Sequence, residues 1–408
     1  MVSCAAASYR RAMPESMTLT PETRELIDTR EWSELWQPAG DIALANHGSY
    51  GRTFLAVRTL HAAIEVETDQ DPARFFRYDH HDRIEAAADE IGEFLGVPAD
   101  HAVAFTHNAS TAVLEAVGAY ATPQGPILTT NLGYGGIRYG LVGLAPRLAT
   151  SYEEVELDSI GDAASIGDAV LEAVEQYTPS VIVLDQISSA TAMRLPVEAL
   201  IPAIRALSPE TRIVIDAAHA AGMERDPVVA GADAWVSNLH KWVCASTGTA
   251  VIVTERGSDM APAFRSWTGD EAFPRSFTWI GTDAKAAYLS APLATQIMDR
   301  LIAAGLDEHI TKILHDAGDE LAEAWGVSPD PRPEGSAAPW MRLIEMPIRS
   351  LTQQELNGAS LIIRNQLKTD VIFTQFQGST FIRLSAHGYN TLGDYERLVE
   401  APSVLSSY

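Results

Sequence analysis

The sequence is poor in cysteine and in lysine, and both shortages narrow the chemistry that it can support. Two cysteines in 408 residues, Cys4 and Cys244, are too few for a disulfide framework or a cysteine-rich metal site. We therefore expect a reducing compartment, the cytoplasm, and no bound metal. An amine nucleophile has only four candidates in the chain, which are Lys241, Lys285, Lys312 and Lys368.

Positive charge and long apolar runs are also scarce. The chain has 54 acidic residues against 29 Lys and Arg, a formal net charge of −25. Such a surface repels phosphate backbones and anionic lipid, so we expect neither nucleic acid nor membrane as a partner. No apolar run is long enough to span a bilayer, and Met1 to Ser16 lacks the order of a secretory signal.

Short apolar runs alternate with amphipathic segments between residues 102 and 253. This pattern predicts an α/β fold with a mostly parallel sheet that helices cover on both faces. Ligands of such sheets bind at the carboxyl ends of the strands. The expected strands are Ala102–Phe105, Pro126–Thr129, Ser180–Asp185, Arg212–Asp216, Ala234–Ser237 and Thr249–Val253.

The chain is too long for one simple core, and we expect two domains. The division is a loosely held lead-in at 1–30, a large domain at 31–300 and a small α+β domain at 301–408. A helix over 284–305 would link the domains. The small domain would contain strands at 340–346 and 380–385, a helix at 352–367 and a last helix from about residue 392.

Lys241 directly follows an expected strand, in an apolar setting. Such surroundings lower the pKa of an amine and allow it to attack an aldehyde. Most lysines extend to solvent, and for Lys241 taken alone that interpretation is favoured over a nucleophile. The nearby Asp216 and His219 favour the nucleophile instead. A carboxylate at the end of a strand can pair with the pyridinium nitrogen of pyridoxal phosphate (PLP), although Asp216 could equally cap the next segment.

Small hydroxyl residues precede an expected helix that runs to about Tyr120. Ser110 and Thr111 there can form a phosphate cradle with free backbone N–H groups, although simple helix capping explains them as well. Tyr134 could stack on a pyridine ring. The glycines around it loosely match a dinucleotide fingerprint with incorrect spacing. Arg383 could bind a substrate carboxylate, or lie at the surface of an edge strand.

Together these motifs resemble the class V aminotransferase family of PLP enzymes, and within it the isopenicillin N epimerase-like branch. No single motif is specific for this family. The order and spacing of the motifs along most of the chain are together specific for it. The motifs are Asn46–Gly51, Arg74–Phe76, Asn108–Thr111, Asp216–His219, Asn238–Trp242, Ile280–Thr282 and Arg383–Asn390.

The resemblance implies PLP fold type I, a homodimer and a set of residue roles. Lys241 would form the Schiff base and move protons at Cα, with Asp216 at the pyridinium nitrogen and His219 near the ring hydroxyl. The other implied cofactor contacts are Ala109, Ser110, Thr111, Tyr134, Gln186, Asn238 and His240, with Thr282 reaching the phosphate of the other subunit. The implied substrate contacts are Arg383, Asn46 and His47.

The resemblance also implies an epimerase or racemase of an amino-acid substrate in natural-product biosynthesis. The alternatives are a C–S lyase acting by β-elimination on a cysteine S-conjugate, a decarboxylating, oxidising or transaminating enzyme, and a non-catalytic binding protein. Two departures from the family stand out, Gly133 where relatives often carry an acid and Asp283 where many carry arginine. No cysteine follows Cys244, so persulfide chemistry is not expected, and Cys244 is predicted to be a small core residue.

Overall fold

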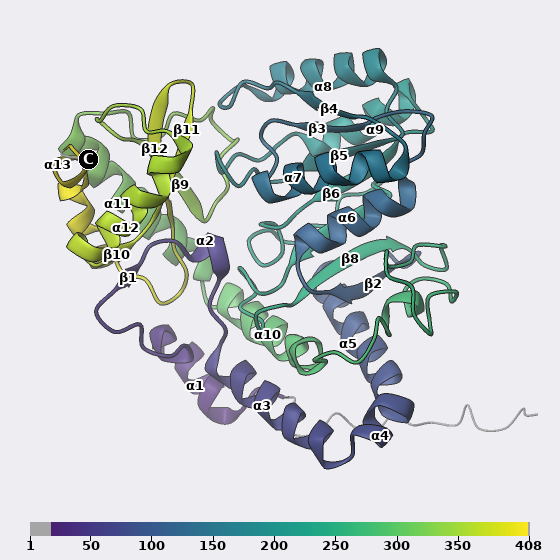
Figure 1. The fold of residues 1–408 in the computed structure, drawn as a ribbon. Helices are drawn as coiled ribbons and strands as arrows, with labels where there is room; N and C mark the ends of the chain where they lie inside the picture. Colours follow the sequence, from purple (N-terminus) through teal and green to yellow (C-terminus); the bar gives the residue numbers. More distant parts are fainter. Residues whose placement is uncertain (1–17, 407–408) are drawn as a thin grey trace, which may run out of the picture.

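The computed structural model describes residues 18–406 and contains a large sheet with its helices beside a smaller α/β body (Figure 1). The large sheet has seven strands in the order β2-β8-β7-β6-β5-β3-β4. Its strands are β2 (His101–Thr106), β3 (Ile127–Thr130), β4 (Tyr152–Val155), β5 (Val181–Asp185), β6 (Arg212–Asp216), β7 (Ala234–Asn238) and β8 (Ala250–Glu255).

The predicted mostly parallel sheet is confirmed. Strands β4, β3, β5, β6 and β7 run parallel, and β8 is antiparallel to both of its neighbours. All six predicted runs form strands. Strand β4 was missed because it lies at the edge of the sheet, where only Val155 is buried, so its sequence has no apolar run.

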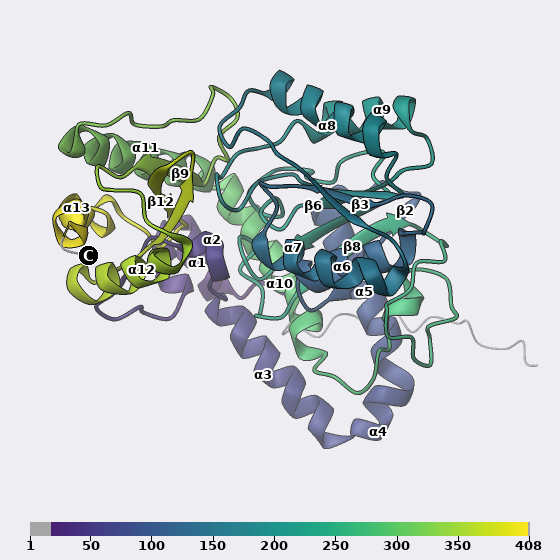
Figure 2. The ribbon, with the colours of Figure 1, turned by 45° about the horizontal axis from the view of Figure 1, so that its top comes forward.

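Alternate residues of each strand supply two separate cores. Val181 and Val183 pack with helices α6 (Ala109–Tyr120) and α7 (Gly135–Leu144) on one face of the sheet. Ile182 and Leu184 pack on the other face. The helices that contribute to that second core include α3 (Leu55–Gln70), α5 (His80–Phe94), α8 (Ala163–Tyr177), α9 (Val197–Leu207) and α10 (Ala286–Ala303), and Figure 2 shows α6 and α7 opposite α8 and α9.

The smaller body contains the three-stranded antiparallel sheet β11-β12-β9, packed with long helices. Its elements are α11 (Leu306–Trp325), β9 (Met341–Glu345), α12 (Gln353–Leu367), β11 (Ile372–Phe376) and β12 (Ser379–Ser385). The expected last helix from residue 392 is shorter than predicted. Two 3-10 turns come first, and α13 spans only Ala401–Leu405, because Pro402 has no N–H to continue the preceding turn.

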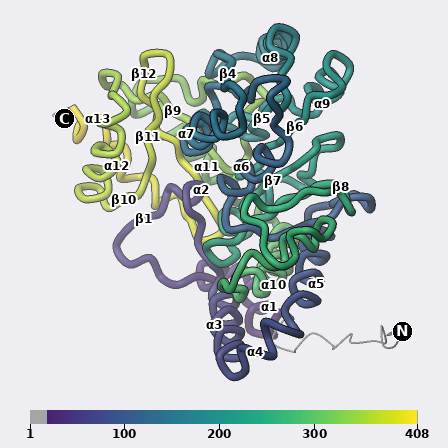
Figure 3. Tube along the Cα trace, turned by 45° about the vertical axis from the view of Figure 1, so that its right-hand side comes forward, coloured from purple at the N-terminus to yellow at the C-terminus, as the bar shows by residue number. Residues whose placement is uncertain are grey.

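The N-terminal segment is more firmly attached than expected. Helix α1 (Pro21–Asp28) is capped by Thr20 and buries Ile27, and Trp32 follows in the same core. Strand β1 (Ala43–Leu44) then pairs in parallel with β10 (Thr369–Asp370) of the smaller body. Figure 3 shows this first segment, in purple, beside the C-terminal part of the chain. The expectations for Cys4 and the rest of 1–17 lie outside the described residues.

Helix α10 occupies the region predicted for the linking helix and packs against α3, α5 and α11. The domain boundaries at 30 and 300 stay predictions. Across residues 18–406, no helix combines the length and the hydropathy needed to cross a bilayer.

Candidate active site

A cavity of about 280 Å³ opens where strands β5, β6 and β7 end. Asp185, Asp216 and Asn238 lie at these ends, on the face of the sheet that carries α6 and α7. The cavity is lined by Ser49, Tyr50, Asn108, Ala109, Ser110, Tyr134, Ile137, Asp185, Ile187, Ser189, Asp216, Ala218, His219, Asn238, His240, Lys241, Ile372 and Arg383. Residues from both bodies and from the N-terminal segment therefore meet around one space.

Lys241 enters this cavity from the turn that follows β7. Its Nζ lies 3.2 Å from Nε2 of His219, and the indole N–H of Trp242 donates to Nδ1 of the same ring at 3.3 Å. Nδ1 therefore accepts, which places the hydrogen of the neutral ring on Nε2, facing the amine. Burial, and then the charge of Arg383, lower the pKa of Lys241 to about 8. The neutral amine, which attacks aldehydes, is thus accessible near physiological pH.

Two buried carboxyl groups stand side by side beneath the cavity. Asp185 and Asp216 are register partners on neighbouring parallel strands and point to the same face of the sheet. Burial and then the neighbouring charge of Asp216 raise the pKa of Asp185 well above its usual value. Burial also raises the pKa of Asp216, while the N–H of Ala218, 3.0 Å away, and Lys241 act against it. Asp216 is therefore the better placed of the two to ionise beside a cation.

The start of α6 forms one wall of the cavity. Asn108 caps this helix by accepting from the N–H of Thr111, and it also accepts from the Thr111 hydroxyl at 3.1 Å. Asn238 accepts from the N–H of Ala109 at 2.9 Å and so ties β7 to the helix start. Ser110 lines the cavity at the first turn. Both sequence interpretations hold here, because the helix is capped and its positive end faces a space that can take a phosphate.

Arg383 projects into the opposite side of the cavity from β12 and is fully buried. Its guanidinium donates to the carbonyl and hydroxyl oxygens of Ser189, to Ser49 at 3.1 Å and to Asn46 at 3.5 Å. Its Nε has no partner, and within residues 18–406 no carboxylate forms an ion pair with it. Burial lowers the pKa of Arg383 to about 10. A buried cation that lacks a counter-ion beside a cavity can bind an anionic group.

The loop before α7 brings Tyr134 to the mouth of the cavity, where 51% of the residue is exposed. Two of the glycines around it are packed closely. A Cβ at Gly133 would lie 3.2 Å from the Thr130 carbonyl oxygen, and one at Gly136 would lie 2.8 Å from the Tyr134 ring. A Cβ at Gly135 would meet nothing within 4 Å.

Five of the predicted site residues do not line the cavity of this chain. Gln186 follows the strand alternation and points to the opposite face from Asp185, where it contacts Glu224, Pro227 and Trp235. His47 is buried behind Lys241 and does not line the cavity.

Thr111 uses its hydroxyl in the helix cap. Thr282 is exposed, and the neighbouring Asp283 pairs with Lys285 at 2.8 Å. Asn46 touches the site only through Arg383 and Ser49.

Sequence reasoning missed several residues that the fold brings to the cavity. Asp185 could have been found, because alternate residues of a strand point to the same face. Asp185 ends the strand that contains Val181 and Val183 and points to the same face as they do. Ser49 and Tyr50 belong to the Asn46–Gly51 motif, which gave them no role of their own. Ser189 and Ile372 carried no comparable signal, since each lies in a loop or at an element end whose position depends on the packing of the two bodies.

Comparison with known proteins agrees with this geometry. The model of the family "Aminotransferase class-V" matches residues 76–272. A probable chloroplastic L-cysteine desulfhydrase of Arabidopsis thaliana is 24% identical over 400 residues, covering 88% of this chain and 82% of the relative. An L-cysteine desulfhydrase of the same plant is 23% identical over 398 residues, covering 88% and 87%.

Among solved structures, the cystine C–S lyase C-DES in complex with its product cysteine persulfide has a TM-score of 0.70 at 15% identity. The alignment covers 89% of this chain and 98% of that one. A NifS-like protein also has a TM-score of 0.70 at 15% identity, with 90% and 100% covered. A C-DES variant with glycine covalently linked to PLP has a TM-score of 0.70 at 16% identity, with 89% and 97% covered. The predicted PLP type I fold is thereby confirmed.

The fold, the family match and the relatives support a PLP-dependent enzyme of the class V aminotransferase type. The residues in the cavity fit the cofactor, because a lysine amine, a buried carboxylate and a helix start surround one space. The predicted enzyme class and cofactor are confirmed, and the non-catalytic alternative is not supported. The matches support the family without supporting the isopenicillin N epimerase-like branch, since the similar proteins carry desulfhydrase, desulfurase and C–S lyase names.

Proposed function

We propose that this protein is a PLP-dependent C–S lyase that releases the sulfur substituent of L-cysteine or a small cysteine S-conjugate. This reaction was the first alternative to epimerisation in the sequence interpretation, and two observations now favour it. The relatives that align along most of the chain are named L-cysteine desulfhydrases. The cavity of about 280 Å³ must hold the cofactor as well as the substrate, which leaves room for only a small amino acid.

The observation that carries an amino-acid substrate is the buried, carboxylate-free guanidinium of Arg383 in the cavity of Lys241. A substrate carboxylate would supply the missing counter-ion and accept from the unpartnered Nε. Ser49 and Ser189 hold the rest of the fork in place. Binding the carboxylate there would fix Cα and its bonds relative to the amine of Lys241.

When bound, PLP supplies an electron sink that stabilises negative charge at Cα. Lys241 would hold the cofactor and, once the substrate amine displaces it, take the Cα proton. The same amine can return a proton to the sulfur as it leaves, giving a thiol or sulfide, and hydrolysis of the remainder gives pyruvate and ammonia. Asp216 would keep the pyridine nitrogen protonated, and the N–H of His219 would hold the amine of Lys241 in line.

The other reactions receive less support. Cys244 is buried and its pKa is raised by burial, so its thiol is a poor nucleophile for persulfide transfer. Epimerisation requires proton donors on both faces of the substrate, and Lys241 with His219 forms a single amine–imidazole pair at 3.2 Å. Epimerisation therefore remains the second candidate.

The deciding experiment incubates the PLP-loaded enzyme with L-cysteine and a panel of S-conjugates in deuterated buffer. Mass spectrometry and a pyruvate assay then identify the products. Pyruvate and a thiol in equal amounts support the lyase. An intact amino acid that carries one deuterium at Cα, with no pyruvate, would instead show reversible proton exchange, as an epimerase requires, and overturn the proposal.

We also propose that the enzyme works as a homodimer in the cytoplasm. Tyr50 and Tyr134 line the cavity and yet are 79% and 51% exposed, so a single chain leaves its mouth uncovered. A second copy that covers this mouth would bring Thr282 to the phosphate, as the family resemblance implies. Light scattering of the holoenzyme tests this directly, since a monomeric mass at micromolar concentration would refute it.

A further inference from the structure

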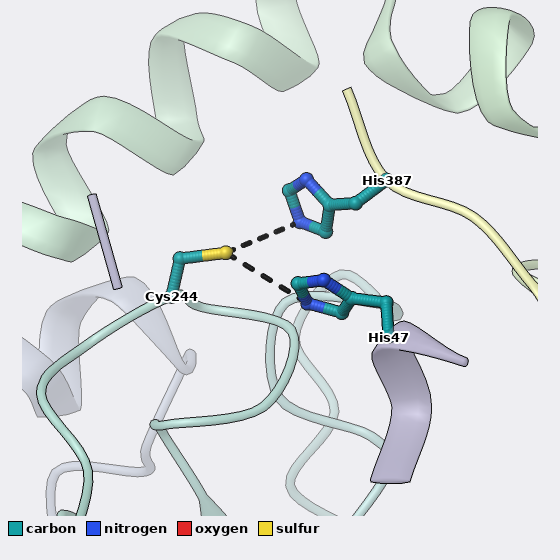
Figure 4. A group of neighbouring side chains, drawn as sticks. All are labelled: His47, Cys244 and His387. Carbon is teal, nitrogen blue, oxygen red and sulfur yellow. Dashed lines mark hydrogen bonds between the residues drawn. The ribbon is translucent and has the colours of Figure 1, made fainter. Parts of the chain in front are cut away.

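A buried group of His47, Cys244 and His387 lies directly behind Lys241, outside the cavity (Figure 4). The three side chains come from α2 (His47–Tyr50), from the turn after β7 and from the loop after β12. The Sγ of Cys244 lies 3.8 Å from Nε2 of His47 and 3.6 Å from Nε2 of His387. Ligands of a metal ion could have this arrangement, so the hydrogen positions decide what the group does.

The hydrogen-bond partners place a hydrogen on Nε2 of both rings. Nε2 of His47 lies 3.1 Å from the carbonyl oxygen of Lys241, and Nε2 of His387 lies 3.1 Å from that of Trp242. A carbonyl oxygen can only accept, so each nitrogen donates. The other nitrogens accept, from the hydroxyl of Tyr389 at 2.9 Å and from the N–H of Gly388 at 2.9 Å. With both Nε2 atoms protonated, the group has no free imidazole lone pair for a metal.

The rings are also held neutral. Burial lowers the pKa of His47 well below its usual value and that of His387 to about 4. The two rings lie 4.4 Å apart between centroids, and Arg52 adds a nearby positive charge that acts in the same direction. Neutral rings with fixed hydrogens act as donors throughout the physiological pH range.

We infer that His47 and His387 are positioning residues that hold the Lys241 turn through its two successive carbonyl groups. The close packing of α2 on this turn leaves the turn little room to move. A Cβ on Gly51 would lie 2.0 Å from the His240 carbonyl and 2.7 Å from that of Lys241, and a Cβ on Gly48 would lie 2.8 Å from the Trp242 ring. Helix α2 thus lies directly against the turn from one side, and the loop after β12 closes the other.

The arrangement links the two ends of the substrate site. Arg383 and His387 lie on β12 and the loop that directly follows it, so the element that would bind the substrate carboxylate also fixes the backbone of the amine. The same segment connects to α2 through Gly48, whose N–H donates to Ser385 at 3.1 Å. The inference requires that Lys241 carries PLP, and it does not depend on whether C–S cleavage or epimerisation follows.

The test compares two substitutions at each histidine in the full-length chain, stripped of PLP and reloaded. The amide nitrogen of glutamine reaches about as far as Nε2, whereas that of asparagine reaches only to Nδ1. His47→Gln and His387→Gln should therefore keep the donor, and His47→Asn and His387→Asn should lose it. His309→Ala is the matched control, because His309 bonds to the Asn390 carbonyl at 3.2 Å without touching the Lys241 turn.

The measurement is the rate constant for Schiff-base formation, followed by the visible absorbance after PLP is added. Loss of one hydrogen bond should slow both Asn variants about fivefold, while the Gln variants and His309→Ala stay within about twofold. Equal slowing of the Asn and Gln variants, or of His309→Ala, would overturn the inference. So would stoichiometric zinc in the purified holoenzyme that disappears in Cys244→Ala. Variants that reload normally but release no thiol would count against the proposed lyase alone.

Discussion

Replacing Arg383 with methionine tests the proposed substrate site most directly. Methionine has a similar length and no charge, so the change removes the cation and its fork while leaving the cavity filled. Losing one partner of a buried charge pair costs about 3–5 kcal/mol. If Arg383 binds the substrate carboxylate, kcat/KM for L-cysteine should therefore fall roughly 200- to 5,000-fold.

The assay compares L-cysteine with cysteamine, which has the same amine and thiol and no carboxylate. The wild-type enzyme should prefer L-cysteine strongly, and Arg383→Met should remove most of that preference. Arg383→Lys is the matched control, because it keeps the charge and loses the two-pronged geometry. Its preference for L-cysteine over cysteamine should lie between those of the wild-type enzyme and Arg383→Met. Equal losses on both substrates in Arg383→Met would refute the carboxylate assignment.

The stability of the substrate-free protein should not fall when Arg383 is replaced by methionine. Burial lowers the pKa of Arg383 to about 10, which means that the charged form is destabilised in the empty site. Removing that unpaired charge should leave the melting temperature of Arg383→Met unchanged or raise it. A large decrease would mean that the bonds to Ser49 and Ser189 outweigh the burial of the charge.

The remaining predictions concern side chains at and around the amine. Lys241→Ala should bind PLP without covalent attachment, so borohydride followed by peptide mass mapping should find no modified residue. Asp216→Asn should lower the pH at which PLP uptake reaches half its maximal rate, because the Asp216 charge raises the pKa of Lys241, whereas Arg383→Met should raise that pH. Cys244→Ala should keep thiol release within a few-fold of wild type and lose about 1–2 kcal/mol of stability in urea unfolding.

The sequence predicted the parts of the fold that depend on local patterns. Buried parallel strands are continuous apolar runs, and all six expected runs became strands. Lys241, Asp216 and Asn238 could be placed in one site because they follow neighbouring strands, whose ends meet. The edge strand β4 could not be seen in this way, since three of its four residues are only partly buried.

Other parts of the site depended on side-chain direction and on distant packing. Gln186 and Asp185 are neighbours in sequence, and the strand alternation sends one away from the cavity and the other into it. His47 belongs to a motif near the substrate loop, but tight packing against the Lys241 turn places its ring behind the amine. Contacts of this kind join residues 194 and 342 positions apart, which no local pattern encodes.

The pairing of β1 with β10 has a consequence for synthesis of the chain on the ribosome. Residues near position 48 contact partners 337 residues further along, so the first-made segment waits until almost the whole chain has emerged. During that interval α2 can pack on the Lys241 turn but not on Ser385, and the turn lacks the support of His387. Translation must therefore be almost complete before the site can close, and a chain that stops early would carry a lysine turn without His387.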